Sequence, residues 1–370
     1  MRWPTVEEQT EGRDAALFDA DALAERHVGR GEFRGMEFLH VNAKTIINVL
    51  PASSRMSFRY TINPYRGCSH ACSYCFARPT HDYLGLGIGE DFERKIVVKV
   101  NAVELLRAEL SARRWSGHHI AMGTNTDPYQ RCEGKYHLTR GVVEVLTEAA
   151  NPFSILTKST LILRDLELLA KAARQADVRV NLSIGTLDEQ VWRLSEPGTP
   201  PPRSRVEAVR RLNEAGVPCG VLVAPILPGL SDRDEQLHDV VEACVEAGAV
   251  AISSVALHLR PGVREHYLRW LGAVRPDLVA ATEARYRGSY LPKADQRALS
   301  EQVRSVVESA RRDRWREVTA MRGDDGPVAG GLTADETVSD RVRLHMGGEP
   351  MQSVSSPPAT PISEQLGLGW

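Results

Sequence analysis

The sequence predicts an α/β fold in which a parallel sheet of six strands is covered by helices and curls toward a partial barrel. Two observations lead to this prediction. From about Phe58 onward, short apolar runs that end at Gly, Pro, Asn or Thr alternate with longer amphipathic patterns of helical period. Right-handed crossovers between parallel strands curl such a sheet, and eight β/α units would close it into a full barrel. This chain has six such units, so we expect the barrel to be incomplete.

Each of the six strands is predicted by a short apolar run rich in β-branched residues. In chain order the strands are expected at 58–63, 119–124, 153–158, 178–185, 220–226 and 249–257. The helices between them have one apolar face, and several are followed by Gly or Asn, which commonly end helices. They are expected at 101–114, 139–150, 163–176, 203–216 and 233–248.

The segments on either side of this alternation have a different composition. The first 40 or so residues are polar with only short apolar runs, and we expect an extension with room for one helix. The end of the chain is rich in Gly, Pro and Ser and poor in large apolar residues, so we expect disorder there. The predicted organisation is an extension at 1–57, an α/β core at 58–262, a helical accessory region at 263–317 and a disordered tail at 318–370.

Composition limits the classes of protein to which the chain can belong. Its 370 residues are 42% hydrophobic and 25% charged, which is enough to bury a sizeable core, and the net charge of −2 gives no overall preference for nucleic acid or membranes. No stretch reads as a signal peptide or a membrane span, so we expect a cytoplasmic protein without membrane association. Residues 260–317 carry 13 Lys and Arg against 8 Asp and Glu. A solvated helical face is the preferred interpretation of that excess.

Three of the six cysteines, Cys68, Cys72 and Cys75, form a Cys-x3-Cys-x2-Cys motif. A [4Fe–4S] cluster held by four thiolates can only pass electrons, whereas one held by three leaves an iron open to a substrate or cofactor. Three thiols therefore favour catalysis. One alternative is a structural zinc site with His70 or His81 as its fourth ligand, and another is a disulfide or free thiols.

The other three cysteines are far apart in the sequence. Cys219 lies at the start of a predicted strand and Cys244 on the apolar face of a predicted helix, so both are interpreted as small buried hydrophobic residues. Cys132 follows the loop after the second predicted strand, and its role stays open.

The cysteine motif, followed directly by the aromatic Phe76 at the end of the first of six β/α units, resembles the radical S-adenosylmethionine (SAM) superfamily. The resemblance implies a partial (β/α)6 barrel in which the three cysteines hold a [4Fe–4S] cluster and its open iron binds SAM, with Phe76 beside the cofactor. An electron from a low-potential donor of the flavodoxin or ferredoxin type would cleave SAM to methionine and a 5′-deoxyadenosyl radical, which takes a hydrogen atom from the substrate.

A second group of candidate cofactor-binding residues follows the second predicted strand. The resemblance implies that this segment lies beside the methionyl amine, and Gly123, Thr126 and Asp127 offer acceptors for an ammonium group. The alternative is an Asx turn in which Asp127, which precedes Pro128, caps a chain reversal.

The later strands end in further candidates. Lys158 at the end of the third strand needs an anionic partner if it is buried, and the SAM carboxylate is the one that the resemblance suggests. Asn181 and Ser183 share one face of the fourth strand, where they could reach the ribose, or they could be core polar groups with partners in the protein. Val223 and Pro225 at the end of the fifth strand suit the adenine.

The segments TDPYQ, TKS, NLSIGT, EPGTPPPRSRVEAVRRL and VLVAPILPGLSD occur in an order that resembles the spore photoproduct lyase-related branch of the superfamily. The resemblance implies a nucleic-acid substrate and a lyase-type reaction. In that lyase a cysteine returns a hydrogen atom to the substrate, and this chain has Thr124 at the matching place. Cys132 is a candidate substitute. The alternative from another class is a non-catalytic iron–sulfur electron-transfer protein or a zinc-stabilised binding protein.

Overall fold

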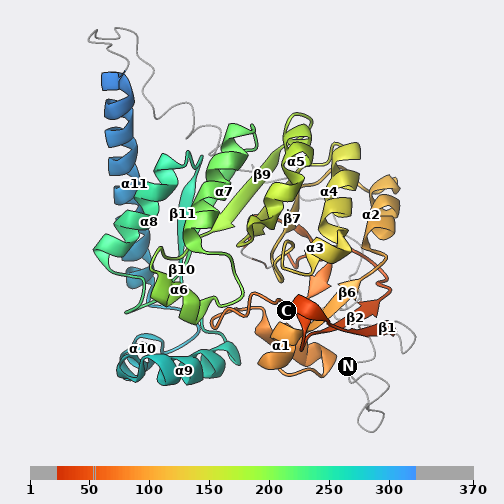
Figure 1. Ribbon diagram of the computed structural model, residues 1–370, viewed down its shortest axis with the longest axis horizontal. Coiled ribbons are helices and arrows are strands. Elements are labelled where there is room, and N and C mark those ends of the chain that lie inside the picture. Colours follow the sequence, from red (N-terminus) through yellow and green to blue (C-terminus); the bar gives the residue numbers. More distant parts are fainter. Residues whose placement is uncertain (1–22, 53, 55, 322–370) are drawn as a thin grey trace.

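The computed structural model describes residues 23–52, 54 and 56–321 (Figure 1). Its main sheet has seven strands, and the six predicted ones are confirmed as parallel neighbours. The seventh strand, β3, pairs antiparallel with β4 at one edge. The sheet is open, with β3 and β11 at its edges. The order is β3 (Ile47–Val49), β4 (Tyr60–Ile62), β7 (Ile120–Met122), β8 (Phe153–Thr157), β9 (Val178–Ser183), β10 (Cys219–Ile226) and β11 (Ile252–Ala256).

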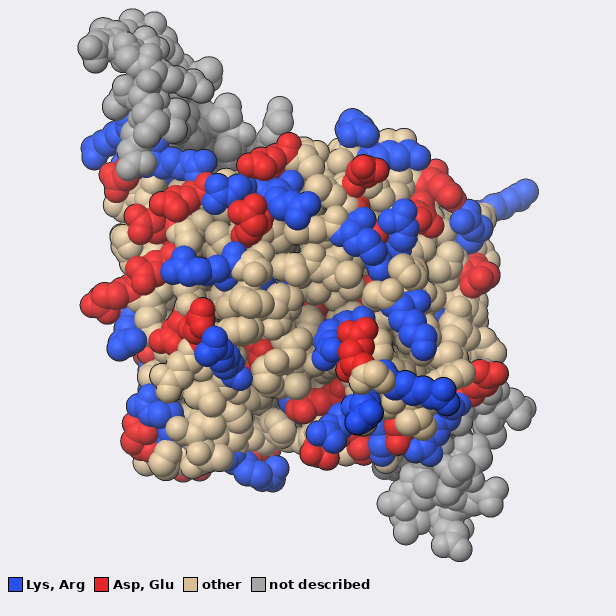
Figure 2. Space-filling model, in the orientation of Figure 1, with Lys and Arg blue, Asp and Glu red and all other residues tan. Residues whose placement is uncertain are grey.

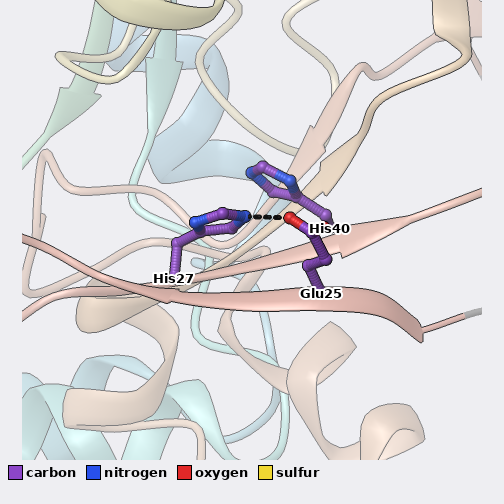
Figure 3. Close-up of side chains that lie close together, drawn as sticks. All are labelled: Glu25, His27 and His40. Atoms are coloured by element: carbon purple, nitrogen blue, oxygen red, sulfur yellow. Dashed lines mark hydrogen bonds and ion pairs between the residues drawn. The ribbon is translucent and has the colours of Figure 1, made fainter.

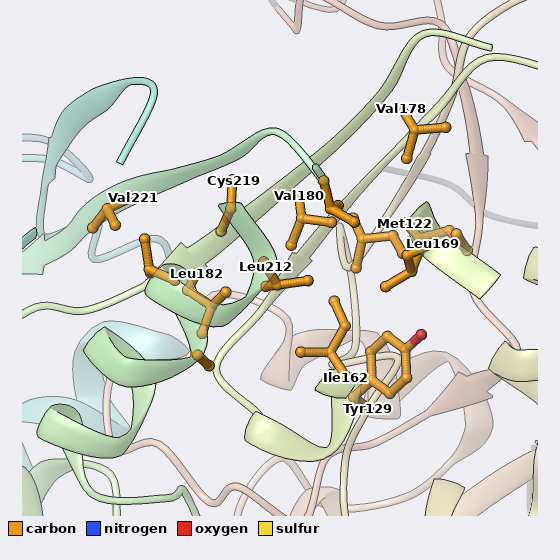
Figure 4. Close-up of a cluster of buried hydrophobic side chains, with 14 of the residues drawn as sticks. Met122, Tyr129, Ile162, Leu169, Val178, Val180, Leu182, Leu212, Cys219 and Val221 are labelled. Atoms are coloured by element: carbon orange, nitrogen blue, oxygen red, sulfur yellow. The ribbon is translucent and has the colours of Figure 1, made fainter. Parts of the chain in front are cut away.

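The five predicted helices are also confirmed, and they pack on the sheet to form the main core. They are α2 (Ala102–Ser111), α4 (Leu138–Glu148), α5 (Leu166–Ala173), α7 (Pro202–Glu214) and α8 (Asp234–Glu246). A 3₁₀ segment, η6 (Thr160–Asp165), forms the start of the third predicted helix. Figure 4 shows part of this core, where side chains of the strands meet those of α5 and α7.

Alternation along the strands separates the core from the opposite face of the sheet. In β9, Val178, Val180 and Leu182 are buried in the core beneath the helices, whereas Asn181 points to the other side of the sheet. Parallel register places Leu156 and Gly220 on either side of Asn181. On this inner face, the polar Asn181 lies beside the small Gly220 toward the carboxyl ends of the strands, where sites in α/β folds form.

A second sheet, which was not predicted, has the order β1 (Leu23–Val28), β2 (Glu37–Val41), β6 (Lys95–Lys99) and β5 (Tyr65–Arg66). The expected helix in the first 40 residues is wrong for the described part of that stretch, which holds two strands and a 3₁₀ turn, η4 (Gly31–Phe33). Strand β2 pairs with β6, which lies far along the chain. Because strand formation depends on such partners, the local sequence of β2 did not predict a strand. Residues 1–22 lie outside the described residues.

The region after the sheet is helical, as predicted for 263–317. It contains α9 (Val263–Val274), η7 (Pro276–Leu278), α10 (Val279–Arg285) and α11 (Lys293–Met321), and α11 packs against α8 and β11 (Figure 1). The tail for which we expected disorder lies outside the described residues beyond Met321. None of the described helices combines the length and the apolar character needed to cross a membrane.

Candidate functional site

The three clustered cysteines lie in one loop that follows β5 and leads into the 3₁₀ segment η5 (Arg78–Leu84). Cys68 and Cys72 are buried and Cys75 is half-buried. Gly67 enters the loop with a φ of +77°, and a Cβ on it would lie 2.8 Å from the carbonyl oxygen of Phe92. That carbonyl accepts a hydrogen bond from the Cys68 N–H at 2.9 Å. The close approach of the two backbones requires glycine.

The last residue of α6 (Glu189–Ser195) and the segment that follows it support the cysteine loop from the other side. The Ser73 N–H donates to the Ser195 carbonyl at 2.9 Å, and the Gly198 N–H donates to the His70 carbonyl at 3.1 Å. A Cβ on Gly198 would lie only 2.1 Å from the carbonyl oxygen of Ser69. The EPGT segment therefore packs directly against the cysteine loop, and position 198 has no room for a side chain.

Burial sets the electrostatics of the thiols. It raises the pKa of the Cys68 thiol well above its ordinary value, that of Cys72 to about 12, and that of Cys75. The guanidinium of Arg78 and the ammonium of Lys158 act in the opposite direction on the pKa of Cys75. A metal centre that binds these sulfurs must displace their protons, because the thiolate is the ligand form.

The donor set fits an iron–sulfur cluster better than a single zinc ion. Ligand sulfurs around one tetrahedral zinc lie about 3.8 Å apart, whereas in the described structure the three thiol sulfurs are not gathered within 4.8 Å of one another. Each of the two histidines proposed as a fourth ligand has one ring nitrogen held by another residue, which leaves the sulfur spacing as the distinguishing observation. His70 Nδ1 lies 3.3 Å from Asp127 Oδ2, and His81 Nε2 lies 3.0 Å from the Lys95 carbonyl oxygen.

Unpartnered polar atoms surround the cysteine loop. Of the six buried side-chain atoms without a hydrogen-bond partner among the described residues, three belong to Arg66, Ser69 and Ser73, and a fourth is His81 Nδ1. His81 lies against Gly67. Buried polar groups rarely lack partners in a folded protein, so such a concentration indicates a bound group that would complete their contacts. The residues present therefore fit a cluster with a polar cofactor.

The loop after β7 is bonded directly to the cysteine loop. Gly123 has a φ of +87°, and a Cβ on it would lie 1.9 Å from the Leu156 carbonyl oxygen. Thr126 Oγ1 donates to the carbonyl of Gly67 at 2.6 Å, and Gln130 Nε2 donates to the same oxygen at 3.1 Å. Sequence reasoning missed Gln130, whose role depends on contacts across the fold.

Asp127 joins three parts of the site. Its carboxylate accepts hydrogen bonds from Thr157 Oγ1 at 2.6 Å and from the backbone N–H groups of Lys158 at 2.7 Å and Tyr129 at 2.9 Å. The last is the Asx turn considered as an alternative. Burial alone would raise the pKa of Asp127, but the His70 ring and these hydrogen bonds hold it below its ordinary value. The carboxylate thus has protein donors on both oxygens.

Lys158 faces an anion, and that anion is a protein carboxylate. Its Nζ donates to Glu196 Oε1 at 3.0 Å, to Ser183 Oγ at 2.7 Å and to the Ala224 carbonyl at 3.3 Å. Glu196 also accepts from Arg205 Nη2 at 2.6 Å and from the hydroxyl of Tyr74, the residue before Cys75. Sequence reasoning missed this buried network, because its members come from five separate segments of the chain.

The remaining candidates divide between the two faces of the sheet. Ser183 and Asn181 lie on the inner face, and Ser183 Oγ donates to the Ala224 carbonyl at 2.8 Å. Pro225 follows a cis peptide bond there and is half-buried. The side chain of Val223 is fully buried in the main core beneath the helices, because strand alternation turns it away from the inner face, so Val223 has only backbone groups to offer an adenine.

The other predicted residues have varied surroundings. Phe76 is 43% exposed beside the cysteine loop. Thr124 is half-buried, and its Oγ1 accepts from Asn63 Nδ2 at 3.4 Å.

Cys132 does not lie where a hydrogen donor is needed. It is fully buried in an apolar cluster with Phe38 and Tyr65 beside the smaller sheet, which corrects its candidacy as a catalytic residue. Cys219 and Cys244 are fully buried in the main core, as predicted.

The comparisons of sequence agree with this geometry. A model of the radical SAM superfamily matches residues 62–241. The uncharacterized protein Rv2578c of Mycobacterium tuberculosis is 43% identical over 283 residues, which cover 76% of this chain and 83% of that protein. The uncharacterized protein MJ0683 of Methanocaldococcus jannaschii is 30% identical over 197 residues, which cover 53% of this chain and 70% of that protein.

The fold also matches a solved structure. Spore photoproduct lyase complexed with dinucleoside spore photoproduct aligns with a TM-score of 0.55 and 19% sequence identity. The alignment covers 74% of this chain and 79% of the lyase chain. At this identity the likeness shows a shared fold.

Proposed function

The chain belongs to the radical SAM superfamily, and from that premise we propose that it binds a [4Fe–4S] cluster through Cys68, Cys72 and Cys75 and uses it to cleave SAM reductively. When bound, the cluster supplies the electron that converts SAM to methionine and a 5′-deoxyadenosyl radical. The observation that carries the proposal is the loop itself, with three thiols and several unpartnered buried polar groups.

Charge around the loop supports an anionic cluster and a zwitterionic cofactor. Arg66 is buried directly before the loop, and its Nη1 has no hydrogen-bond partner. In the buried network, Lys158 and Arg205 carry two positive charges, whereas Glu196 carries one negative charge. The surplus positive charge would favour thiolates and a methionyl carboxylate nearby. We assign Lys158 and Glu196 the task of holding the cofactor side of the loop in place.

We propose that the rest of SAM lies along the inner face of the sheet. We propose that Gly123, Thr126 and Asp127 shape the backbone beside the amine, whereas Asn181, Ser183 and Pro225 line the nucleoside side. Gly123 and Gly220 have no side chain there, and a Cβ on either would collide with a neighbouring strand or side chain.

The electron has to come from another protein. Cys75 is the least buried of the three cysteines, and Phe76 beside it is exposed. We propose that a low-potential donor of the flavodoxin or ferredoxin type docks near these two residues.

For the substrate, we propose a molecule with a nucleobase as the first class to test. His258 and Tyr290 stack at a centroid distance of 4.1 Å after β11, and Tyr290 is 60% exposed. Leu257 and Leu259, on either side of His258, are buried in one apolar cluster with Cys72 and Tyr74, so this segment lies near the cysteine loop. An exposed aromatic surface beside a cation can stack a base. Lys and Arg alternate with Asp and Glu on the face in Figure 2, so a long nucleic acid has less support there than a nucleotide-sized ligand.

The deciding experiment is anaerobic reconstitution of the full chain with iron and sulfide, followed by addition of SAM and dithionite. We expect about four irons per chain and formation of 5′-deoxyadenosine, measured by chromatography. A colourless protein that binds one zinc through the cysteines and leaves SAM intact would instead support the zinc-stabilised binding protein.

Thr124 allows a separate test of the reaction type. A hydroxyl O–H bond is too strong to return a hydrogen atom to a substrate radical, and Cys132 is buried elsewhere. We therefore expect no multiple-turnover repair of dinucleotide spore photoproduct by the wild type, even while SAM is cleaved. Some repair by the variant Thr124→Cys would show a lyase-like pocket, and efficient repair by the wild type would contradict the expectation.

A further inference from the structure

Strand β1 lies at the edge of the smaller sheet, and the part of it whose side chains are described, from Glu25 onward, has no buried residue. Its residues from Glu25 to Val28 are all exposed, and Val28 is 69% exposed. Backbone pairing with β2 and the ion pair between Arg26 and Glu37, at 2.6 Å, hold it in place. An exposed ion pair contributes little to stability, so a further link between this edge strand and β2 would matter.

Three side chains with metal-binding atoms meet on this hairpin (Figure 3). Glu25 lies directly opposite His40 in the strand register, and His27 follows two residues later on the same face. His27 Nε2 is 2.7 Å from Glu25 Oε2, and the two histidine rings have a centroid distance of 4.1 Å. One ligand atom from each residue lies within 4.8 Å of the others, and the described residues contain no other such group of three.

The histidine that lies deepest is oriented by a second residue. His40 Nε2 is hydrogen-bonded to the hydroxyl of Tyr136 in α3 (Glu133–Tyr136) at 2.9 Å. The Tyr136 ring is itself packed against Phe38 of β2, with a centroid distance of 5.6 Å. A metal-binding histidine commonly has its second nitrogen held by such a partner, and Nδ1 of His40 is then left for a ligand.

We propose that Glu25, His27 and His40 bind a divalent transition-metal ion, with zinc as the probe, and that this ion fastens β1 to the rest of the smaller sheet. Two imidazoles and a carboxylate are ligands that zinc accepts, and three protein ligands leave a fourth position for water. Ligand atoms around tetrahedral zinc lie about 3.3 Å apart. The exposed Glu25 and His27 side chains can separate to that spacing. The site is independent of the cluster and of the proposed enzyme activity.

The test uses the cluster-loaded full chain, equilibrated with zinc in the presence of a competing chelator and then analysed for both metals. We expect one zinc per chain in addition to the iron. His27→Ala and His40→Ala should each weaken zinc binding at least tenfold. Tyr136→Phe keeps the ring but loses the hydroxyl, so it should weaken binding by about ten- to a hundredfold. The matched control is His238→Ala, an exposed histidine 3.6 Å from Glu242 without a third ligand nearby, and it should change nothing.

A second measurement separates this site from the cysteines, which also bind zinc when the cluster is absent. The triple variant Cys68→Ala, Cys72→Ala, Cys75→Ala should still bind one zinc, and zinc should slow hydrogen exchange of the β1 amides in it and in the wild type. The proposal is overturned if the loaded wild type binds no zinc, if His40→Ala binds zinc as tightly as the wild type, or if binding is lost with the cysteines. Failure of SAM cleavage would leave these results unaffected.

Discussion

At the scale of single residues, the site depends on thiols that the fold keeps protonated until a metal centre arrives. Burial raises the pKa of all three, and unpartnered polar atoms of Arg66, Ser69 and Ser73 lie in the same stretch. Without a cluster and cofactor, the loop therefore contains buried polar groups that lack hydrogen-bond partners. We expect a bound cluster and cofactor to supply those partners. Such a loop should be intolerant of losing any one ligand.

The first prediction tests that intolerance. Cys72→Ala, like Ala at Cys68 or Cys75, should abolish the visible absorbance of the reconstituted cluster, because only two thiolates are left. Cys244→Ala is the control, since that thiol lies in the main core and should affect stability alone. A Cys72→Ala chain that still holds four irons and four sulfides would show that the ligand assignment is wrong.

Glu196 is the most strongly perturbed carboxylate of the buried network. Burial would raise its pKa, but the charges of Arg205 and Lys158, with the hydrogen bond from Tyr74, hold that pKa far below its ordinary value of 4.5. A depressed pKa in the folded state contributes stability that is complete above the unfolded-state pKa and is lost as the pH falls through the folded-state pKa.

The second prediction concerns acid stability. We expect the free energy of unfolding of the wild type to fall as the pH drops below about 5, and Glu196→Gln to remove part of that slope. At neutral pH the variant should lose about 3–5 kcal/mol, because two buried cations are left without their carboxylate. Glu189→Gln, in an exposed pair with Arg193, should cost little. Urea unfolding at several pH values measures both effects, and equal slopes for Glu196→Gln and the wild type would contradict the assignment.

At the scale of elements, loops from distant parts of the chain hold the cysteine loop. The segment after β7 binds it through Thr126 and Gln130, and the end of α6 with the residues that follow binds it through Ser195 and Gly198. None of these four residues lies in a strand of the main sheet. The strands set the spacing, and the loops that follow them determine the geometry of the site.

The third prediction tests the tightest of these contacts. In Gly198→Ala the new methyl group would collide with backbone atoms of Ser69 and His70, so the loop has to move. We expect cluster loading to fall severalfold while the far-ultraviolet circular dichroism stays close to that of the wild type. Gly89→Ala is the control, because a Cβ there meets nothing within 4 Å. Full loading of Gly198→Ala would show that the contact is not required.

At the scale of the whole molecule, the helices after the sheet are part of the site's support. Tyr267 and Leu271 of α9 and Tyr286 are buried in one apolar cluster with Cys72 and Tyr74. Farther along, Val303 and Val307 of α11 belong to the main core. The helical region therefore covers both the cysteine loop and the edge of the sheet.

The fourth prediction follows from that packing. Leu271→Ala should lower the free energy of unfolding by about 2–5 kcal/mol, because a fully buried side chain leaves a cavity. It should also make the cluster easier to lose in chelator, since the cavity opens beside the loop. Val250→Ala, at an exposed position, should do neither. Wild-type stability together with wild-type cluster retention in Leu271→Ala would refute the coupling.

The sequence by itself determined the order of the six parallel strands and their five helices, together with the three cysteines. Local patterns indicate these features: apolar runs indicate the strands, helical periodicity indicates the helices, and a ligand spacing of a few residues indicates the cysteine motif. Strand and helix type depends mainly on neighbouring residues, so it could be predicted without knowing the fold. The strand patterns also placed Lys158 directly after the third parallel strand and put Asn181 and Ser183 on one face of the fourth.

Only the tertiary structure decided the partners of those residues. It joined Lys158 to Glu196 and Arg205, turned Val223 into the core, buried Cys132 beside the smaller sheet, and brought Glu25 to two histidines. Such contacts join residues that are far apart in the chain or on different strands. They depend on register and on the packing of loops, and a shift of one residue would turn every side chain of a strand to the other face.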